Sequence, residues 1–128
     1  MMPGSKKKVL FEGKLYSNKS VDLNMKKYSY LVITYCLYDY QDSNTGGSSN
    51  VMIIDLTKKA DKFTNYQTSK RHPYNIFNNT KDSCSGSMDA ACEVNASKTN
   101  LKAFFAYNGA IQASTVTMYY ISKIVGIK

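Results

Sequence analysis

Residues 28–38 read Tyr-Ser-Tyr-Leu-Val-Ile-Thr-Tyr-Cys-Leu-Tyr and form the densest apolar stretch of this sequence. β-Branched and aromatic side chains dominate the stretch, as is typical of β-strands. Both alternating sets of positions are largely apolar, which predicts a central strand covered on both faces. The stretch is shorter than the roughly 18–20 apolar residues that a membrane-spanning helix requires, so we expect no membrane insertion.

Shorter strand patterns, separated by turn residues, continue in both directions from this stretch. Gly13 predicts a bulge or bend in the first of them, and Asn108-Gly109 predicts a two-residue hairpin turn. The predicted strands are 8–16, 21–23, 51–56, 63–68, 91–96 and 101–107, while 110–128 fits one long strand or two joined by a bulge. Small chains of many short strands usually close into a sandwich or barrel. We expect an all-β fold, an antiparallel and jelly-roll-like β-sandwich of about eight strands.

The chain has 128 residues, of which 43% are hydrophobic and 20% are charged. This composition is too apolar for a disordered chain and suits one globular domain. We expect a flexible N-terminal segment over residues 1–7 and a single domain over residues 8–128. Because Glu12 interrupts the apolar residues that follow the first lysines, the sequence predicts no signal peptide.

The formal net charge is +8, which suggests nucleic acid or an anionic surface as a partner. Arg71 is the only arginine, whereas base recognition favours the bidentate arginine side chain. The lysines are also spread along the chain, mostly in pairs. A solvated basic surface is therefore the favoured interpretation, and a nucleic-acid partner is the less favoured one.

The cysteines Cys36, Cys84 and Cys92 do not have the spacing of a metal site, and His72 is the only histidine. We expect no metal and no cofactor. Cys36 lies in a strand pattern and is predicted to be a small buried side chain. A disulfide could close the loop between Cys84 and Cys92, but reduced thiols are favoured because nothing indicates an oxidising compartment.

Catalytic patterns are weak throughout the sequence. Nucleophilic catalysis needs a base beside a serine or cysteine, and His72 precedes Pro73 in a polar segment typical of a solvent-facing histidine. The acidic residues are scattered, and Gly46-Gly47 lacks the lysine and helix start of a phosphate-binding loop. We therefore predict that the protein is not an enzyme and that its role is in binding or structure.

Tyrosine is the most informative surplus, with 11 residues against no tryptophan. A tyrosine ring is easily immobilised and offers both an apolar face and a hydroxyl, so binding surfaces use it heavily. Most tyrosines lie in predicted strands, where packing explains them. The residues placed in or beside loops are the predicted contacts to a sugar or partner protein: Tyr38, Tyr40, Asn44, Arg71, His72, Tyr74, Tyr107 and Asn108.

Four segments at the two ends of the chain resemble one known pattern. They are Val-Leu-Phe-Glu-Gly-Lys-Leu-Tyr at 9–16, Ser-Val-Asp-Leu at 20–23, Tyr-Ser-Tyr-Leu-Val-Ile-Thr-Tyr at 28–35 and Tyr-Ile-Ser-Lys-Ile-Val-Gly-Ile-Lys at 120–128. Their order resembles that of C-terminal β-sandwich domains of tail-fibre and baseplate-type structural proteins from phages and prophages of low-GC bacteria. The resemblance covers about the first third and the last tenth of the chain.

This resemblance implies a virion structural protein, assembled in the host cytoplasm, that forms a homotrimer and displays loops towards a host-surface glycan or protein. Rigid β-scaffolds with variable loops suit such adhesion. One alternative is a capsid or tail accessory (decoration) protein that binds other virion proteins. A second alternative is a nucleic-acid-binding β-barrel that uses lysine and tyrosine.

Overall fold

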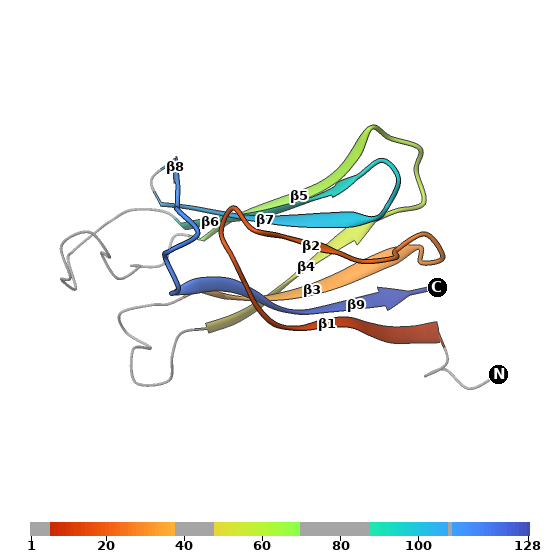
Figure 1. Cartoon of the computed structure of the whole chain (residues 1–128), viewed down its shortest axis with the longest axis horizontal. Coiled ribbons are helices and arrows are strands. Elements are labelled where there is room, and N and C mark those ends of the chain that lie inside the picture. Colours follow the sequence, from red (N-terminus) through yellow and green to blue (C-terminus); the bar gives the residue numbers. More distant parts are fainter. Residues whose placement is uncertain (1–5, 38–47, 70–87, 108) are drawn as a thin grey trace.

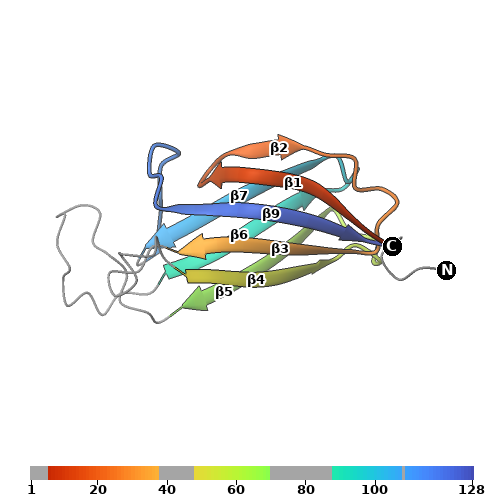
Figure 2. The ribbon, with the colours of Figure 1, turned by 90° about the horizontal axis from the view of Figure 1, so that it is seen from below.

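The computed structural model describes residues 6–37, 48–69, 88–107 and 109–128. These residues form two antiparallel sheets packed face to face (Figures 1 and 2), which confirms the predicted β-sandwich. The strands are β1 (Lys7–Tyr16), β2 (Ser20–Asp22), β3 (Tyr30–Leu37), β4 (Ser48–Asp55), β5 (Lys62–Ser69), β6 (Met88–Asn95), β7 (Asn100–Tyr107), β8 (Ala110–Ile111) and β9 (Tyr119–Ile127). Within the described ranges, no helix has the length and apolar content needed to cross a bilayer.

The first sheet has the strand order β1-β9-β3-β4, and the second has the order β2-β7-β6-β5 with β8 added beside β7. Strands from the two ends of the chain pair in a nested way, β1 with β9 and β2 with β7, which is the jelly-roll-like element of the fold. The pairs β3–β4 and β5–β6 are hairpin partners within one sheet each. The described residues thus contain nine strands rather than eight, because 110–128 divides into β8 and β9.

The predicted local features of the strands are largely confirmed. Gly13 has a φ of 153° and lies where the β1–β9 register shifts, so the bulge predicted there is present. Tyr107 pairs with Ala110, so two residues connect β7 to β8 as the hairpin signal required. β1 begins at Lys7, one residue before the predicted domain start, because Lys7 pairs with Ile127.

The prediction that β3 is covered on both faces is wrong. Leu31, Ile33, Tyr35 and Leu37 are buried between the sheets, whereas the alternate residues lie on the outer face, where Tyr30 is 42% exposed. In a two-layer sandwich each sheet has only one covered face. The apolar residues on the outer face instead pair with apolar neighbours across the sheet, as Val32 does with Ile53. Cys36 shares this outer face and is half-buried, not buried as predicted.

The core between the sheets is built around three aromatic rings. The ring centroid of Phe105 lies 6.3 Å from that of Tyr35 and 6.3 Å from that of Tyr119. Cys92 is a free thiol that faces this core, with its Sγ atom 3.4 Å from the Sδ atom of Met52. This placement supports the preference for a reduced thiol at Cys92. Cys84 lies outside the described residues.

Hydrogen bonds from single side chains tie the two sheets together at both margins. The Ser17 hydroxyl follows β1 and accepts a 2.9 Å hydrogen bond from the backbone N–H of Phe105 on β7. At the opposite margin, Asn65 Nδ2 on β5 donates to the carbonyl oxygen of Ile53 on β4. The Tyr35 hydroxyl also donates to Gln67 Oε1 across the core. These bonds fix the relative position of the sheets, and therefore of the surfaces that they carry.

Candidate binding groove on the outer face of β5, β6 and β7

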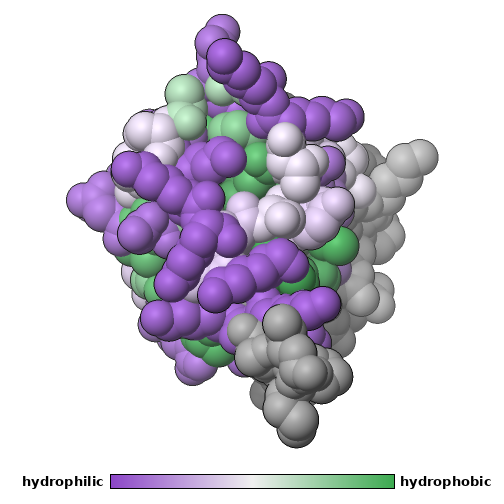
Figure 3. All heavy atoms as spheres, turned by 90° about the vertical axis from the view of Figure 1, so that its right-hand side faces the viewer, coloured by the Kyte–Doolittle hydropathy of each residue, from purple (hydrophilic) through white to green (hydrophobic). Residues whose placement is uncertain are grey.

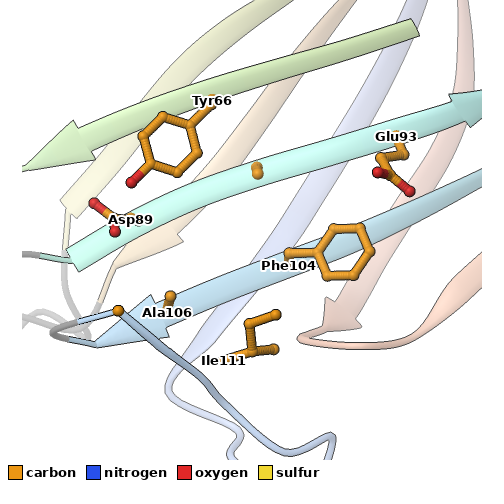
Figure 4. A pocket seen from close by; sticks show the side chains of 8 residues that line it. Tyr66, Asp89, Glu93, Phe104, Ala106 and Ile111 are labelled. Carbon is orange, nitrogen blue, oxygen red and sulfur yellow. The ribbon is translucent and has the colours of Figure 1, made fainter. Parts of the chain in front are cut away.

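A groove of about 350 Å³ lies on the outer face of the second sheet (Figure 4). Its side chains project from outward positions of β5, β6, β7 and β8, and they combine aromatic, small and acidic residues. The lining residues are Tyr66, Asp89, Ala91, Glu93, Phe104, Ala106, Gly109 and Ile111. All of them lie on strands or in a tight turn of one continuous sheet, so the backbone that positions them is hydrogen-bonded throughout.

The strand register places two aromatic rings on either side of a small residue. Tyr66 on β5 pairs with Ala91 on β6, and Ala91 pairs with Phe104 on β7. Neighbouring strands are about 4.8 Å apart, so the backbones that carry the two rings are separated by about 10 Å. Ala91 therefore forms a low floor between two walls. The Phe104 ring also makes a cation–π contact with Lys102, whose Nζ atom lies 5.1 Å from the ring centroid.

Two carboxylates mark the ends of the groove along β6. Asp89 and Glu93 are four residues apart on the same face, which corresponds to about 13 Å along the strand. Glu93 forms an ion pair of 3.2 Å with Lys62 and pairs in register with Lys102, so its charge is compensated. Asp89 is only 8% exposed, and its Oδ1 atom has no hydrogen-bond partner. The two ends of the groove therefore differ in electrostatic character.

The wall beyond Ala106 is apolar and exposed. Ala106 pairs with Asp89 on one side and with Ile111 of β8 on the other. Ile111 is 60% exposed and Tyr66 is 63% exposed, the two highest values among the exposed large hydrophobic side chains of the described residues. Figure 4 shows the Tyr66 hydroxyl pointing towards the Asp89 carboxylate. The groove thus offers flat apolar surfaces with hydrogen-bonding groups at their margins, which suits a ligand with alternating apolar and hydroxylated faces.

Seven of the predicted contact residues lie outside the described residues: Tyr38, Tyr40, Asn44, Arg71, His72, Tyr74 and Asn108. Tyr107 is described, and its side chain faces the core, where it is 8% exposed. Its role in ligand contact stays a prediction. The strand residues that flank the undescribed internal segments are nevertheless brought together, since Leu37 pairs with Ser48, Ser69 with Met88 and Met88 with Tyr107. These pairs lie at the end of the sandwich where β3, β5 and β7 end and where β4 and β6 begin (Figure 2).

The groove residues themselves were not predicted from the sequence. Tyr66 lies in a pattern in which Phe63, Asn65 and Gln67 alternate with Thr64, Tyr66 and Thr68. That alternation does not mark Tyr66 as outward, because Asn65 and Gln67 on the inner face are at least as polar as Thr64 and Thr68 on the outer face. Phe104 and Phe105 are adjacent, so one of them had to point away from the core. Lys102 shares a face with Phe104, and this was the available signal that Phe104 is the one that points outward.

The opposite end of the sandwich carries most of the described lysines. This lysine-rich end consists of the start of β1, the end of β9 and the turns after β2, β4 and β6, and Figure 3 shows its largely hydrophilic surface. Its basic residues are Lys6, Lys7, Lys8, Lys26, Lys27, Lys58, Lys59, Lys98 and Lys128. Within the part of the chain that the structure describes, none of them forms an ion pair. Nine of the fourteen lysines that the structure describes thus lie at one end of the sandwich.

The described residues bring no group of three histidine, cysteine or acidic side chains together in an arrangement that could hold a metal ion. No family model, no curated protein and no solved structure matches this chain. The geometry of the groove and of the lysine-rich end therefore carries the functional argument.

Proposed function

We propose that this protein is a non-enzymatic adhesion protein whose groove on the second sheet binds a glycan of a cell surface. The observation that carries the proposal is the pair of aromatic rings, Tyr66 and Phe104, held on either side of Ala91. Aromatic side chains offer large, rigid contact area at low entropic cost, and the apolar face of a sugar ring can pack on them. The groove volume of about 350 Å³ is in the range of small-ligand sites.

The spacing of the groove carboxylates supports binding without hydrolysis. Glycoside hydrolysis uses two carboxyl groups about 5–9.5 Å apart, one on each side of the scissile bond. Asp89 and Glu93 project from the same face of one strand at positions about 13 Å apart. Glu93 is also engaged by Lys62, which leaves it poorly placed to act as an acid or base. This spacing favours a glycan that is held and released unchanged.

The biological setting that we propose is the virion of a phage or prophage, in which the domain acts at a fibre tip as a homotrimer. The resemblance of residues 9–35 and 120–128 to tail-fibre and baseplate-type domains supports this setting. Shallow grooves bind single sugars weakly, so several copies held together would raise the overall affinity. A capsid or tail accessory protein that binds other virion proteins stays the alternative within the same setting.

Replacing either aromatic wall should weaken glycan binding about tenfold, because each ring contributes burial and stacking contact. The experiment screens the protein on a glycan array and then titrates the best-bound oligosaccharide by calorimetry into Tyr66→Ala and Phe104→Ala. Ile53→Ala is the matched control, because Ile53 is a large exposed residue on the outer face of the other sheet. We expect the control to bind as the unmodified protein does.

Two outcomes would overturn this assignment. If the array shows no glycan bound, adhesion through a glycan is wrong. If binding persists in both aromatic variants but is lost when Tyr38, Tyr40 and Tyr74 are replaced by alanine, the site lies at the contacts predicted from the sequence and not in the groove.

The lysine-rich end supports a second candidate function, binding to the phosphate backbone of a nucleic acid. The described strands form two sheets, and lysines without an ion pair can neutralise phosphates on any scaffold. The candidate predicts retention on immobilised DNA that falls steeply with salt. Lys26→Gln combined with Lys27→Gln should lower the salt slope by about two, whereas Lys14→Gln on β1 should leave it unchanged. Elution at or below about 0.1 M salt would exclude this function.

A further inference from the structure

The Asp89 carboxylate is the one buried side-chain oxygen among the described residues that has no hydrogen-bond partner. Burying a carboxylate is costly unless a positive charge or hydrogen-bond donors compensate it. Asp89 faces outward on β6, away from the core residues Met88 and Ala90 that flank it in sequence. Its burial therefore does not result from core packing. The unsatisfied oxygen lies in the groove itself, at the end marked by Ile111 and Ala106 (Figure 4).

Neither the neighbours of Asp89 in the sheet nor the Tyr66 hydroxyl, which points towards the carboxylate, donates a hydrogen bond to the Oδ1 atom of Asp89. Thr68 and Ala106 are its register partners on β5 and β7, and Ile111 lies one strand further. Glu93, at the other end of the groove, has Lys62 within 3.2 Å. Among the described residues, a ligand in the groove would thus meet a carboxylate paired with lysine at one end and, at the other, a carboxylate whose Oδ1 atom has no hydrogen-bond partner.

We propose that the groove is selective for a glycan with a free amino group, an amino sugar whose ammonium binds the Asp89 carboxylate; this inference rests on the glycan-binding function proposed above. An ammonium group supplies both the positive charge and the N–H donors that the buried oxygen lacks, and such charge-assisted bonds are about twice as strong as neutral ones. Sugars that carry carboxylates are repelled by Asp89. Neutral sugars can still stack on the two rings. Their hydroxyls can donate hydrogen bonds to the Asp89 oxygen, but they supply no positive charge as an ammonium group does.

The strand register places the two aromatic rings and the Asp89 carboxylate close enough together for a single sugar ring to contact all three. The row that contains the aromatic walls and the row that contains Asp89 are two residues apart on β6, or about 7 Å. A pyranose ring packed between Tyr66 and Phe104 can therefore direct a ring substituent at the Asp89 carboxylate. The Tyr66 hydroxyl, which points towards Asp89, lies on the same side and can contact that substituent (Figure 4).

The test compares glucosamine oligomers with N-acetylglucosamine oligomers of the same length by titration calorimetry. The unmodified protein should bind the amine form at least about tenfold more tightly, since a hydrogen bond to a charged group contributes about 1.5–3 kcal/mol. Asp89→Asn should abolish this preference and keep the weaker binding of the acetylated form. Glu12→Gln is the matched control and should keep the preference, because Glu12 is an exposed carboxylate on β1 of the other sheet and lies outside the groove. The net charge of +8 opposes binding of cationic oligomers, so a preference for the amine reports a local carboxylate.

The outcomes separate this inference from the function on which it rests. If the unmodified protein binds both oligomers equally, the amino-sugar selectivity is wrong, whereas glycan binding stands. If the preference persists in Asp89→Asn as judged on folded protein, Asp89 is not its source and the inference fails. If neither these oligomers nor any glycan binds, the proposed function fails with it. The comparison of the two oligomers on the unmodified protein needs no variant, so it decides the selectivity even if Asp89→Asn does not fold.

Discussion

Gly126→Ala should destabilise the protein by about 3 kcal/mol, because the tyrosine ring that covers this glycine leaves no room for a methyl group. A Cβ atom on Gly126 would lie 2.7 Å from the Cγ and Cδ1 atoms of Tyr28, which real side chains do not tolerate. The Tyr28 ring is 4% exposed, and its atoms nearest to Gly126 are at the base of the ring, so it cannot swing aside cheaply. Denaturant titration of the variant measures the loss. Gly126 belongs to the closing segment of the family resemblance, and this contact explains physically why a glycine stands there.

A double-mutant cycle with Tyr28→Ala tests the stated cause. Tyr28→Ala alone should also destabilise, because a buried ring is lost, but Gly126→Ala should then add less than about 1 kcal/mol. Val125→Ala is the matched control, since Val125 is the adjacent strand residue and lies half-buried on the outer face. An equal cost of Gly126→Ala with and without the Tyr28 ring would show that the contact is not responsible.

Raising the pH from 9 to 12 should remove several kcal/mol of stability. Burial raises the pKa of the Cys92 thiol to about 12 from its ordinary value of 9.0, and burial also raises the pKa values of Tyr35 and Tyr119. The folded state keeps these protons while the unfolded chain loses them, so rising pH favours unfolding. The stabilisation is complete below pH 9 and disappears as the pH approaches 12. Three pKa units at Cys92 correspond to about 4 kcal/mol.

Denaturant titrations at pH 8, 10 and 11 measure this loss, and Cys92→Ala identifies its main source. The variant should be less stable at pH 8, because a core side chain is shortened, yet it should lose less stability with rising pH. Tyr119→Phe should flatten the remaining dependence above pH 10, because it removes a second buried ionisable group. A Cys92→Ala variant with the same pH slope as the unmodified protein would contradict the assignment.

Local sequence patterns predicted the layers and turns of this fold well. Residues 30–37 of the predicted apolar stretch form β3 in the middle of the first sheet, and the Asn108-Gly109 signal joins two paired strands. These features depend on propensities of a few adjacent residues, which a sequence displays directly. The prediction that both faces of β3 are covered was wrong. The alternation shows that both faces are apolar, but it does not show whether another sheet packs on each of them.

The groove depends on pairing between distant strands, and this is why the sequence did not reveal it. Tyr66, Ala91 and Phe104 are separated along the chain and become neighbours only through the register of β5, β6 and β7. The strand that contains Asp89 was expected to begin at residue 91 and to end at residue 96. β6 begins at Met88, since Met88 pairs with both Ser69 and Tyr107. That pairing draws Asp89 into the sheet and makes it a groove residue.

The backbone N–H of Lys128 donates a 2.9 Å hydrogen bond to the carbonyl oxygen of Lys6, so both ends of the described chain leave the sandwich side by side. Figure 1 shows them at the pole opposite the hairpin that carries β8. A carrier fused to either terminus, or a sensor chip coupled through it, would consequently present the molecule in the same orientation. With the protein attached through either terminus, the end of the groove that contains Asp89 would face the solution and stay accessible to dissolved saccharides.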